Sequence, residues 1–293
     1  MQTSEEQLQI WASGPSDTEL TRCQNARSMI YDCLKSSFGE EIQVFLQGSY
    51  RNSTNVKYES DIDIVVLNPN FYFPDYSHIG VLEQSRAKAH FEPSGYAFLQ
   101  FKTEVHGLLA SAFGTGGVTR KNKCIHIDEN TYRVKTDVVS AFVHRRYING
   151  DRWHEGIEFV TDSGIRVHSF PKHHYENGVV KNKTTVERYK PSVRILKHIR
   201  DLLVEDRLMQ PEEMSSFFVE CLVWNAFDNG FYAGSRYKDR IPAIITDLQR
   251  RCRNPLHAMG MKEVNNLKPL FSSTAGRSSE QANRFFSLVI ERY

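Results

Sequence analysis

The sequence predicts a mixed α/β (α+β) fold, in which an α/β lobe is followed by a helical lobe. Short apolar runs typical of strands occur only before Thr184. After that residue the apolar spacing is helical throughout. We therefore expect residues 1–184 to form an α/β core with an N-terminal helix, and residues 185–293 to form a C-terminal helical lobe.

Composition narrows the class of protein. Of the 293 residues, 40% are apolar and 25% are charged, as is typical of a globular protein. No run approaches the roughly 18 apolar residues of a membrane span, and the N-terminus resembles no secretion signal. Five cysteines without a C-x-x-C pair favour neither a zinc site nor disulfides. We expect a cytoplasmic protein that does not act at a membrane.

The net charge argues against one kind of partner. Lys and Arg number 37 and Asp and Glu number 35, which gives a net charge of +2. Proteins that grip a long duplex usually carry a larger basic excess. We therefore expect no obligatory nucleic acid partner.

The α/β lobe begins with a helix. Apolar residues recur every three or four positions over Thr18–Phe38, and Gly39 ends the pattern. A short strand is predicted at Ile42–Leu46, and a short helix is plausible over residues 50–55. Asp61–Leu67 has the composition of a buried strand.

A helical stretch and two hairpins complete this lobe. Residues 80–113 are predicted to be mostly helical. The first hairpin pairs Cys124–Ile127 with Tyr132–Phe142, and the second pairs Ile157–Thr161 with Ile165–Phe170.

The helical lobe begins near a capping-box pattern formed by Thr184 and Glu187. Pro191 lacks an N–H donor, so the helix that follows either kinks there or begins near Lys190. Further helices are predicted over residues 216–227, 241–252 and 278–290.

Three carboxylates are the strongest functional signal. Asp61 and Asp63 project from the same face of a strand, where they repel each other unless cations lie between them. Mg²⁺ is a hard cation that prefers oxygen ligands. Asp137 lies in an apolar strand, and a buried carboxylate is unfavourable unless it binds a metal or pairs with a base. A salt bridge to a nearby Lys or Arg is the alternative for Asp137.

A turn at Gly48-Ser49 precedes the acidic strand. Glycine lets backbone N–H groups approach a phosphate closely, and the serine hydroxyl adds a donor. An ordinary turn at the end of a strand is the alternative. The turn and the three carboxylates together resemble the nucleotidyltransferase pattern. That resemblance implies two Mg²⁺ ions, which Mn²⁺ can replace, bound by Asp61, Asp63 and Asp137, with Asp137 also the candidate general base.

Longer stretches resemble the bacterial cGAS/DncV-like nucleotidyltransferases, most closely clade E. The stretches are Phe45–Val66, His174–Thr185, Tyr189–Arg200 and Ser215–Trp224. The resemblance implies a polymerase-β-like core and a helical lobe that closes the nucleotide cleft. It also implies synthesis of a cyclic dinucleotide from two nucleoside triphosphates, with release of pyrophosphate. In this family the product acts on a separately encoded effector in anti-phage (CBASS) defence.

The resemblance also carries individual residues. The family's triphosphate lysine falls on Lys197, and a helix-start serine that binds phosphate falls on Ser216. Phe217, next to it, could stack on a base. The alternatives are a solvated charge for Lys197, a plain N-cap for Ser216 and core packing for Phe217.

Residue 169 bears on the choice of base. Pyrimidine-using relatives carry an Asn before an aromatic-Pro-Lys sequence, whereas this chain has Ser169 before Phe170-Pro171-Lys172. The shorter serine favours purines, so ATP and/or GTP are the expected substrates. The alternative is that Ser169 only ends a strand.

Two other functions remain open from the sequence alone. An RNA-end nucleotidyltransferase would use the same core, although the near-neutral charge argues against it. A catalytically silent nucleotide-binding module would usually have lost an acid, and all three acids are present.

Overall fold

The computed structural model describes residues 3–56, 61–89, 91 and 95–293. The chain divides into two compact units. The sheet unit consists of Ser16–Gly48 and Ser60–Pro171, and the helical unit consists of Met1–Pro15, Ser49–Glu59 and Lys172–Tyr293. This division differs from a single boundary at 184/185, because three stretches of residues 1–184 belong to the helical unit: Met1–Pro15, Ser49–Glu59 and residues 172–184.

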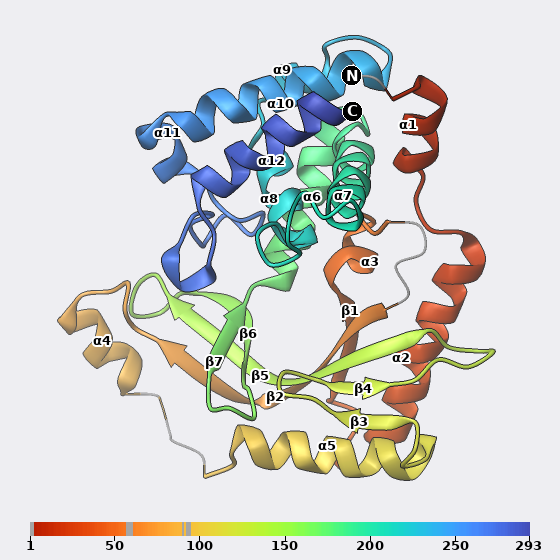
Figure 1. The fold of residues 1–293 in the computed structure, drawn as a ribbon. Helices are drawn as coiled ribbons and strands as arrows, with labels where there is room; N and C mark the ends of the chain where they lie inside the picture. The colour runs from red at the N-terminus through yellow and green to blue at the C-terminus, as the bar shows by residue number, and fades with distance from the viewer. Residues whose placement is uncertain (1–2, 57–60, 90, 92–94) are drawn as a thin grey trace. The chain divides into compact units, whose positions relative to one another are not determined.

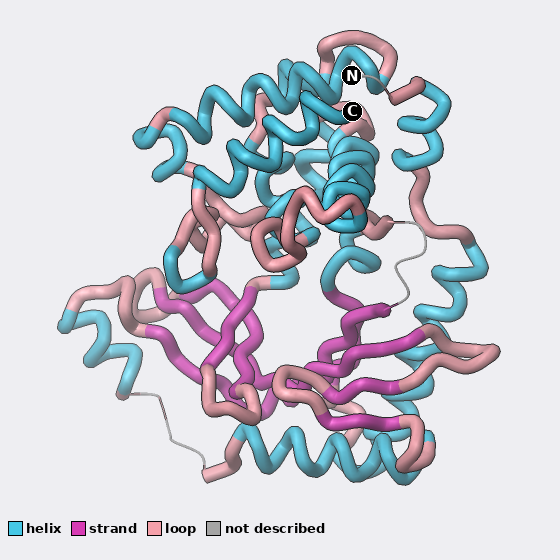
Figure 2. Tube along the Cα trace, viewed as in Figure 1, coloured by secondary structure: helices cyan, strands magenta, loops and turns pink. Residues whose placement is uncertain are grey.

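One seven-stranded sheet forms the centre of the sheet unit, and its strands are magenta in Figure 2. The order is β1-β2-β5-β4-β3, with β6 pairing to β5 and β7 pairing to β6. Among the strands of the described ranges, only β2 and β5 pair in parallel. The strand bounds are β1 Gln43–Gln47, β2 Asp61–Asp75, β3 Val118–Arg120, β4 Ile125–Ile127, β5 Lys135–Tyr147, β6 Trp153–Val160 and β7 Arg166–Ser169. Both predicted hairpins are confirmed, as β4–β5 and β6–β7.

The acidic strand β2 is longer than predicted. It continues beyond Leu67 to Asp75, and its register to β5 shifts between Asn68 and Tyr72. Pro69 lies inside this irregularity, where its missing N–H removes no ladder hydrogen bond. The neighbouring strand β5 begins at Lys135, three residues after the predicted start, and ends at Tyr147.

The helices of the sheet unit pack against its strands (Figure 1). They are α2 (Asp17–Phe38), α4 (Val81–Lys88) and α5 (Phe98–Phe113). The helix α2 ends at Gly39 as predicted, and a capping box of Ser16 and Glu19 begins it. It packs against β1, β2 and α5, while α5 packs against β3, β5 and β6. On β2, Ile62, Ile64 and Val66 are buried on one face. On the other face Asp61 and Asp63 are exposed, while Val65 and Leu67 are buried in a second apolar cluster.

The helical unit is built around the buried helix α7. Its helices are α1 (Glu5–Ala12), α6 (Pro171–Thr184), α7 (Tyr189–Glu205), α8 (Ser216–Asn225), α9 (Asp228–Phe231), α10 (Tyr237–Arg253), α11 (Pro255–Gly260) and α12 (Ser279–Arg292); α3 (Gly48–Asn52) begins at the last residue of the sheet unit. Side chains of α1, α7, α8, α10 and α12 share one core. No helix in the described ranges is long and apolar enough to cross a membrane.

The predicted capping box at the start of this unit is wrong. Val186 and Glu187 have positive φ angles of 50° and 58°, so they form a left-handed turn between α6 and α7. The helix α7 begins at Tyr189, which agrees with the predicted start near Lys190. Pro191 therefore lies in the first turn, where a missing N–H needs no partner.

Candidate active site

The sheet unit places three carboxylates on one face of two neighbouring strands. Asp61 and Asp63 are exposed on β2, while Ile62 and Ile64 between and after them are buried on the opposite face. In the parallel register between β2 and β5, Asp63 lies directly beside Asp137. Paired residues on adjacent strands project to the same side, so all three carboxylates share a face.

Gly48 lies against this acidic face. It follows Gln47, the residue of β1 that pairs with Asp63. Its φ is +67°, and a Cβ built on it would lie 2.5 Å from Oδ2 of Asp63. The positive φ favours glycine, and any side chain at this position would have to displace the Asp63 carboxylate. Ser49, the other residue of the predicted phosphate turn, begins the stretch that belongs to the helical unit.

Basic groups accompany two of the acids. Nζ of Lys135 lies 3.6 Å from Oδ1 of Asp61, and Nζ of Lys121 lies 3.6 Å from Oδ1 of Asp137. Nδ1 of His126 is 2.6 Å from the same oxygen of Asp137. His126 was not among the residues predicted from sequence, although it lies in the predicted β4–β5 hairpin and pairs directly with Asp137 in its register.

The environment of Asp137 keeps it ionised. Burial raises the pKa of Asp137. Hydrogen bonds from His126 and Cys124 and the charge of Lys121 together lower this pKa by more than burial raises it, so it lies below the ordinary value. Burial and the neighbouring carboxylate raise the pKa of the Cys124 thiol to about 12, so this cysteine stays protonated and donates to Asp137.

The donor set fits divalent cations. Among the described residues, no group of three or more His, Cys, Asp and Glu side chains is already arranged around a metal position. However, three carboxylates on one face provide the oxygen ligands that Mg²⁺ prefers. Ammonium groups of Lys121 and Lys135 already lie near two of them, which shows that this face attracts positive charge.

Ser169 is the last residue of β7 and pairs with Ile157 of β6. Next to that partner, Gly156 allows a close backbone approach, since a Cβ there would lie 2.4 Å from the carbonyl oxygen of Ser169. The side chain of Ser169 is half-buried. It therefore lies at a strand end whose backbone position is tightly fixed.

Ser216 and Phe217 form the start of α8. The N-cap is Ser215, whose Oγ accepts from the backbone N–H of Phe218 at 3.2 Å, so the alternative of Ser216 as a plain N-cap is wrong. Phe217 is 38% exposed, so the alternative of core packing is also wrong. Its ring contacts that of His174, with centroids 5.7 Å apart.

Lys197 lies inside the helical unit. Lys197 is only 1% exposed, and its Nζ is 2.9 Å from Oε2 of Glu220. The alternative of a solvated helix charge is therefore wrong. The same Nζ lies 3.4 Å from Oγ1 of Thr54, so both of these contacts are made within the protein.

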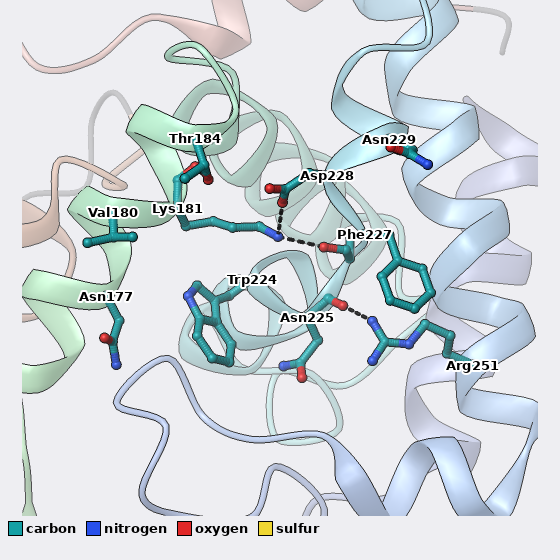
Figure 3. A pocket seen from close by; sticks show the side chains of 11 residues that line it. Asn177, Val180, Lys181, Thr184, Trp224, Asn225, Phe227, Asp228, Asn229 and Arg251 are labelled. Carbon is teal, nitrogen blue, oxygen red and sulfur yellow. Dashed lines mark hydrogen bonds and ion pairs between the residues drawn. The ribbon is translucent and has the colours of Figure 1, made fainter.

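A separate cavity of about 630 Å³ lies in the helical unit (Figure 3). Its lining comes from α6 and from α8 to α10 and includes none of the predicted site residues. Lys181 crosses it and donates to the carbonyl oxygen of Ala226 and to Asp228, each at 2.6 Å. The guanidinium of Arg251 lies 4.4 Å from the ring centre of Phe227. The charged groups of this cavity are thus already paired within the protein.

Comparison with known proteins identifies relatives over the whole chain. Residues 27–104 match the nucleotidyltransferase domain family, and residues 176–293 match the cGAS/DncV-like nucleotidyltransferase C-terminal helical domain. The cyclic dipurine nucleotide synthase of Elizabethkingia meningoseptica is 37% identical over 97% of this chain and 96% of its own. The cyclic dipyrimidine nucleotide synthase CdnE of Cecembia lonarensis is 33% identical over 98% of this chain and 97% of its own.

Solved structures agree with this assignment. The CdnE cyclic dinucleotide synthase of Elizabethkingia meningoseptica, determined with GTP and Apcpp, has a TM-score of 0.82 at 35% identity, covering 99% of this chain and all (100%) of that chain. The CdnE c-UMP-AMP synthase of Rhodothermus marinus, determined with Apcpp and Upnpp, has a TM-score of 0.84 at 30% identity. The match covers 99% of this chain and 96% of that chain. The predicted fold class is confirmed. The chain belongs to the cGAS/DncV-like nucleotidyltransferases, in the clade E group that contains these CdnE enzymes.

Proposed function

We propose that this nucleotidyltransferase joins two purine nucleoside triphosphates, ATP and/or GTP, into a cyclic dinucleotide and releases pyrophosphate. The register of β2 and β5 carries this proposal, because it sets Asp63 beside Asp137 and leaves Asp61 on the same face. Three aligned carboxylates suit nucleotidyl transfer better than mere nucleotide binding, since a binding site gains nothing from their mutual repulsion.

The carboxylates take different parts in the proposed mechanism. Asp61 and Asp63, two residues apart on β2, hold the side of the site that receives the triphosphate. Asp137 has a lowered pKa and is ionised at neutral pH, so it can accept the proton of the attacking hydroxyl. His126 and Cys124 both donate to Asp137 and thereby fix the orientation of its carboxylate.

The remaining predicted residues would bind the nucleotides. Gly48 has no side chain to block its backbone N–H from a phosphate, and the hydroxyl of Ser49 can donate to one. Ser216, in the first turn of α8, lies where helix N–H groups favour an anion. The exposed ring of Phe217 can stack on a base.

Divalent metal ions are a general requirement of nucleotidyltransferases of this kind. We propose two Mg²⁺ ions, replaceable by Mn²⁺, with Asp61, Asp63 and Asp137 as ligands. When bound, such ions stabilise negative charge on the attacking and leaving oxygens.

The preference for purines rests on Ser169 at the end of β7. The relatives differ in the base that their names give: one is a dipurine synthase and another a dipyrimidine synthase. Family membership therefore leaves the base open, and the short serine side chain supports a purine. We also propose that the product acts on a separately encoded effector in cytoplasmic anti-phage (CBASS) signalling.

Product analysis tests the proposal directly. The purified protein is incubated with single and mixed nucleoside triphosphates and Mg²⁺, treated with phosphatase and analysed by mass spectrometry. A phosphatase-resistant cyclic dipurine supports the proposal, and a pyrimidine-containing product corrects only the base. Extension of added RNA, or equal yields from wild type and Asp63→Asn, contradicts it. Asp32→Asn, which removes an exposed carboxylate from α2, serves as the control.

A further inference from the structure

Glu220 is a carboxylate buried inside the helical unit. Glu220 lies on α8 and is 3% exposed. Four side chains contact its two oxygens: Nδ2 of Asn52 at 3.3 Å, Oγ1 of Thr54 at 2.7 Å, Nε2 of His174 at 2.8 Å and Nζ of Lys197 at 2.9 Å. Each oxygen has two partners, so the carboxylate is fully satisfied by groups from three separate segments.

These partners keep Glu220 ionised. Burial raises the pKa of Glu220. Lys197, His174 and Thr54 together lower this pKa by more than burial raises it, so it lies well below the ordinary value. A buried carboxylate with this many donors forms a rigid junction, because each partner loses its hydrogen bond if it moves.

Thr54 connects this junction to the predicted phosphate turn. Its hydroxyl donates to Glu220, and its backbone N–H donates to the carbonyl oxygen of Ser49 at 2.9 Å. One residue therefore joins Glu220 to Ser49. Within the helical unit this chain of two hydrogen bonds fixes where Ser49 lies.

Two further contacts hold the stretch between Ser49 and Thr54. Nη1 of Arg194 donates to the carbonyl oxygen of Ser53 at 2.6 Å, and Ser53 has a left-handed backbone with φ of 55°. The guanidinium of Arg51 lies 4.3 Å from the ring centre of Tyr175. The stretch is thus held in a bent conformation by side chains of α6, α7 and α8.

A second arm leads from the same carboxylate to Phe217. His174 contacts Glu220 through Nε2, and its ring contacts the ring of Phe217. Both Ser49 and Phe217, predicted to bind the phosphate and the base, are therefore one residue away from Glu220. A single carboxylate connects two parts of the proposed nucleotide site.

We propose that Glu220 and Thr54 are positioning residues, which hold Ser49 in the geometry that nucleotidyl transfer requires. Lys197 serves the same purpose by neutralising Glu220. This inference rests on the proposed function, because Ser49 needs a fixed position only if it binds a reacting phosphate. Misplacement of a binding group by about 1 Å can reduce turnover by roughly a hundred-fold.

Thr54→Val is the variant that tests the proposal. Glu220→Gln leaves Lys197 buried without its counter-charge and is expected to fold poorly. Valine has nearly the shape of threonine but cannot donate to Glu220. We expect kcat to fall at least ten-fold while KM for the nucleotides changes less than three-fold. Thr54→Ser restores the hydroxyl and should recover most of the kcat.

Thr185→Val is the matched control. Thr185 is also fully buried in the helical unit, donates to the carbonyl oxygen of Lys181 at 2.8 Å and accepts from the N–H of Tyr189. Thr185→Val removes the same hydroxyl group, at a position without contact to Glu220 or Ser49. Its kcat per folded molecule should equal that of the wild type.

Hydrogen exchange of the Thr54 amide gives a second measurement that does not depend on activity. We expect exchange at least ten-fold faster in Thr54→Val than in the wild type or Thr185→Val. Unchanged exchange overturns the positioning role, and so does faster exchange with unchanged kcat in an active enzyme. An inactive wild type contradicts the proposed function instead, and the exchange data then decide the positioning of Ser49 alone.

Discussion

Gly48 and Asp63 approach each other so closely that a side chain at position 48 would displace the Asp63 carboxylate. A Cβ there would lie 2.5 Å from Oδ2 of Asp63, on a backbone whose φ is already +67°. The contact couples the predicted phosphate turn to a predicted metal ligand within the sheet unit. Displacement of either residue therefore moves the other.

Gly48→Ala should abolish activity by forcing Asp63 aside. The matched control is Gly39→Ala, because Gly39 also has positive φ (+81°) but no atom within 4 Å of its Cβ position. Both variants lose about 1–2 kcal/mol of stability to backbone strain. Only Gly48→Ala should also lose product formation, which a cyclic dinucleotide assay on both proteins measures. Equal activities of the two variants would show that the contact with Asp63 does not matter.

Asp61→Asn and Asp63→Asn should each remove activity while the protein stays folded. Both side chains are exposed, and each change removes a ligand charge and also relieves repulsion on the strand. Product formation should fall on the order of a hundred-fold or more, as when a group that stabilises transition-state charge is removed. Without Mg²⁺ the melting temperature should hold or rise slightly. Addition of Mg²⁺ should raise the melting temperature of the wild type more than that of either variant, and wild-type turnover by a variant would reject the metal assignment.

Lys197→Ala should destabilise the protein strongly. From sequence alone, weaker nucleotide binding with little effect on folding is expected. The buried pair with Glu220 predicts instead a loss of about 3–5 kcal/mol, because one charge is left buried without its partner. Lys197→Met combined with Glu220→Gln removes both charges and should recover much of that loss. Urea unfolding measures both, and a stability of Lys197→Ala equal to wild type would contradict the pair's role.

Acid should destabilise the wild type through Glu220. The folded-state pKa of this carboxylate lies below its ordinary value of 4.5. Its contribution to stability is therefore complete above about pH 4.5 and is lost as the pH falls below that value toward the folded-state pKa. In the double variant with Lys197→Met and Glu220→Gln, the free energy of unfolding should depend less on pH between 4.5 and 3. If the free energies of unfolding of the two proteins changed with pH in the same way, Glu220 would have the same pKa in the folded and unfolded states, which contradicts the prediction.

Ser169→Asn should move incorporation from purines toward UTP. A serine hydroxyl offers one donor and two acceptor lone pairs, and it constrains a base less than the amide of asparagine. A site that hydrogen-bonds a base edge discriminates well, since the wrong base leaves buried polar groups unpaired. Competition between labelled ATP, GTP and UTP measures the change. Equal entry of UTP and purines into the wild-type product, with no change in the variant, would reject this role for Ser169.

Local patterns were sufficient to predict the acidic face. Alternation along a strand sets Asp61 and Asp63 on one side, and the apolar neighbours indicate which side is buried. The two hairpins were also local, because each is closed by a short turn with clear signals. The register between β2 and β5 could not be predicted in this way, since the two strands are far apart in the sequence.

Two of the missed features depend on contacts between distant segments. From sequence, Lys197 has the pattern of an exposed basic residue. In the structure it is buried in an ion pair with Glu220 of α8. The stretch from Ser49 to Thr54 has no pattern of its own that assigns it to the helices. Left-handed residues 186 and 187 replaced the predicted capping box, because the chain turns too sharply there for the helix to begin.

The contacts of residues 51–54 with α6, α7 and α8 have a consequence for biosynthesis. On the ribosome, Ser49 emerges long before Glu220, so its hydrogen-bonding partner through Thr54 does not yet exist. A chain that stops before α8 contains β2 and β5 but lacks Glu220, which supports Ser49 through Thr54. Activity should therefore appear only after translation of the C-terminal helices.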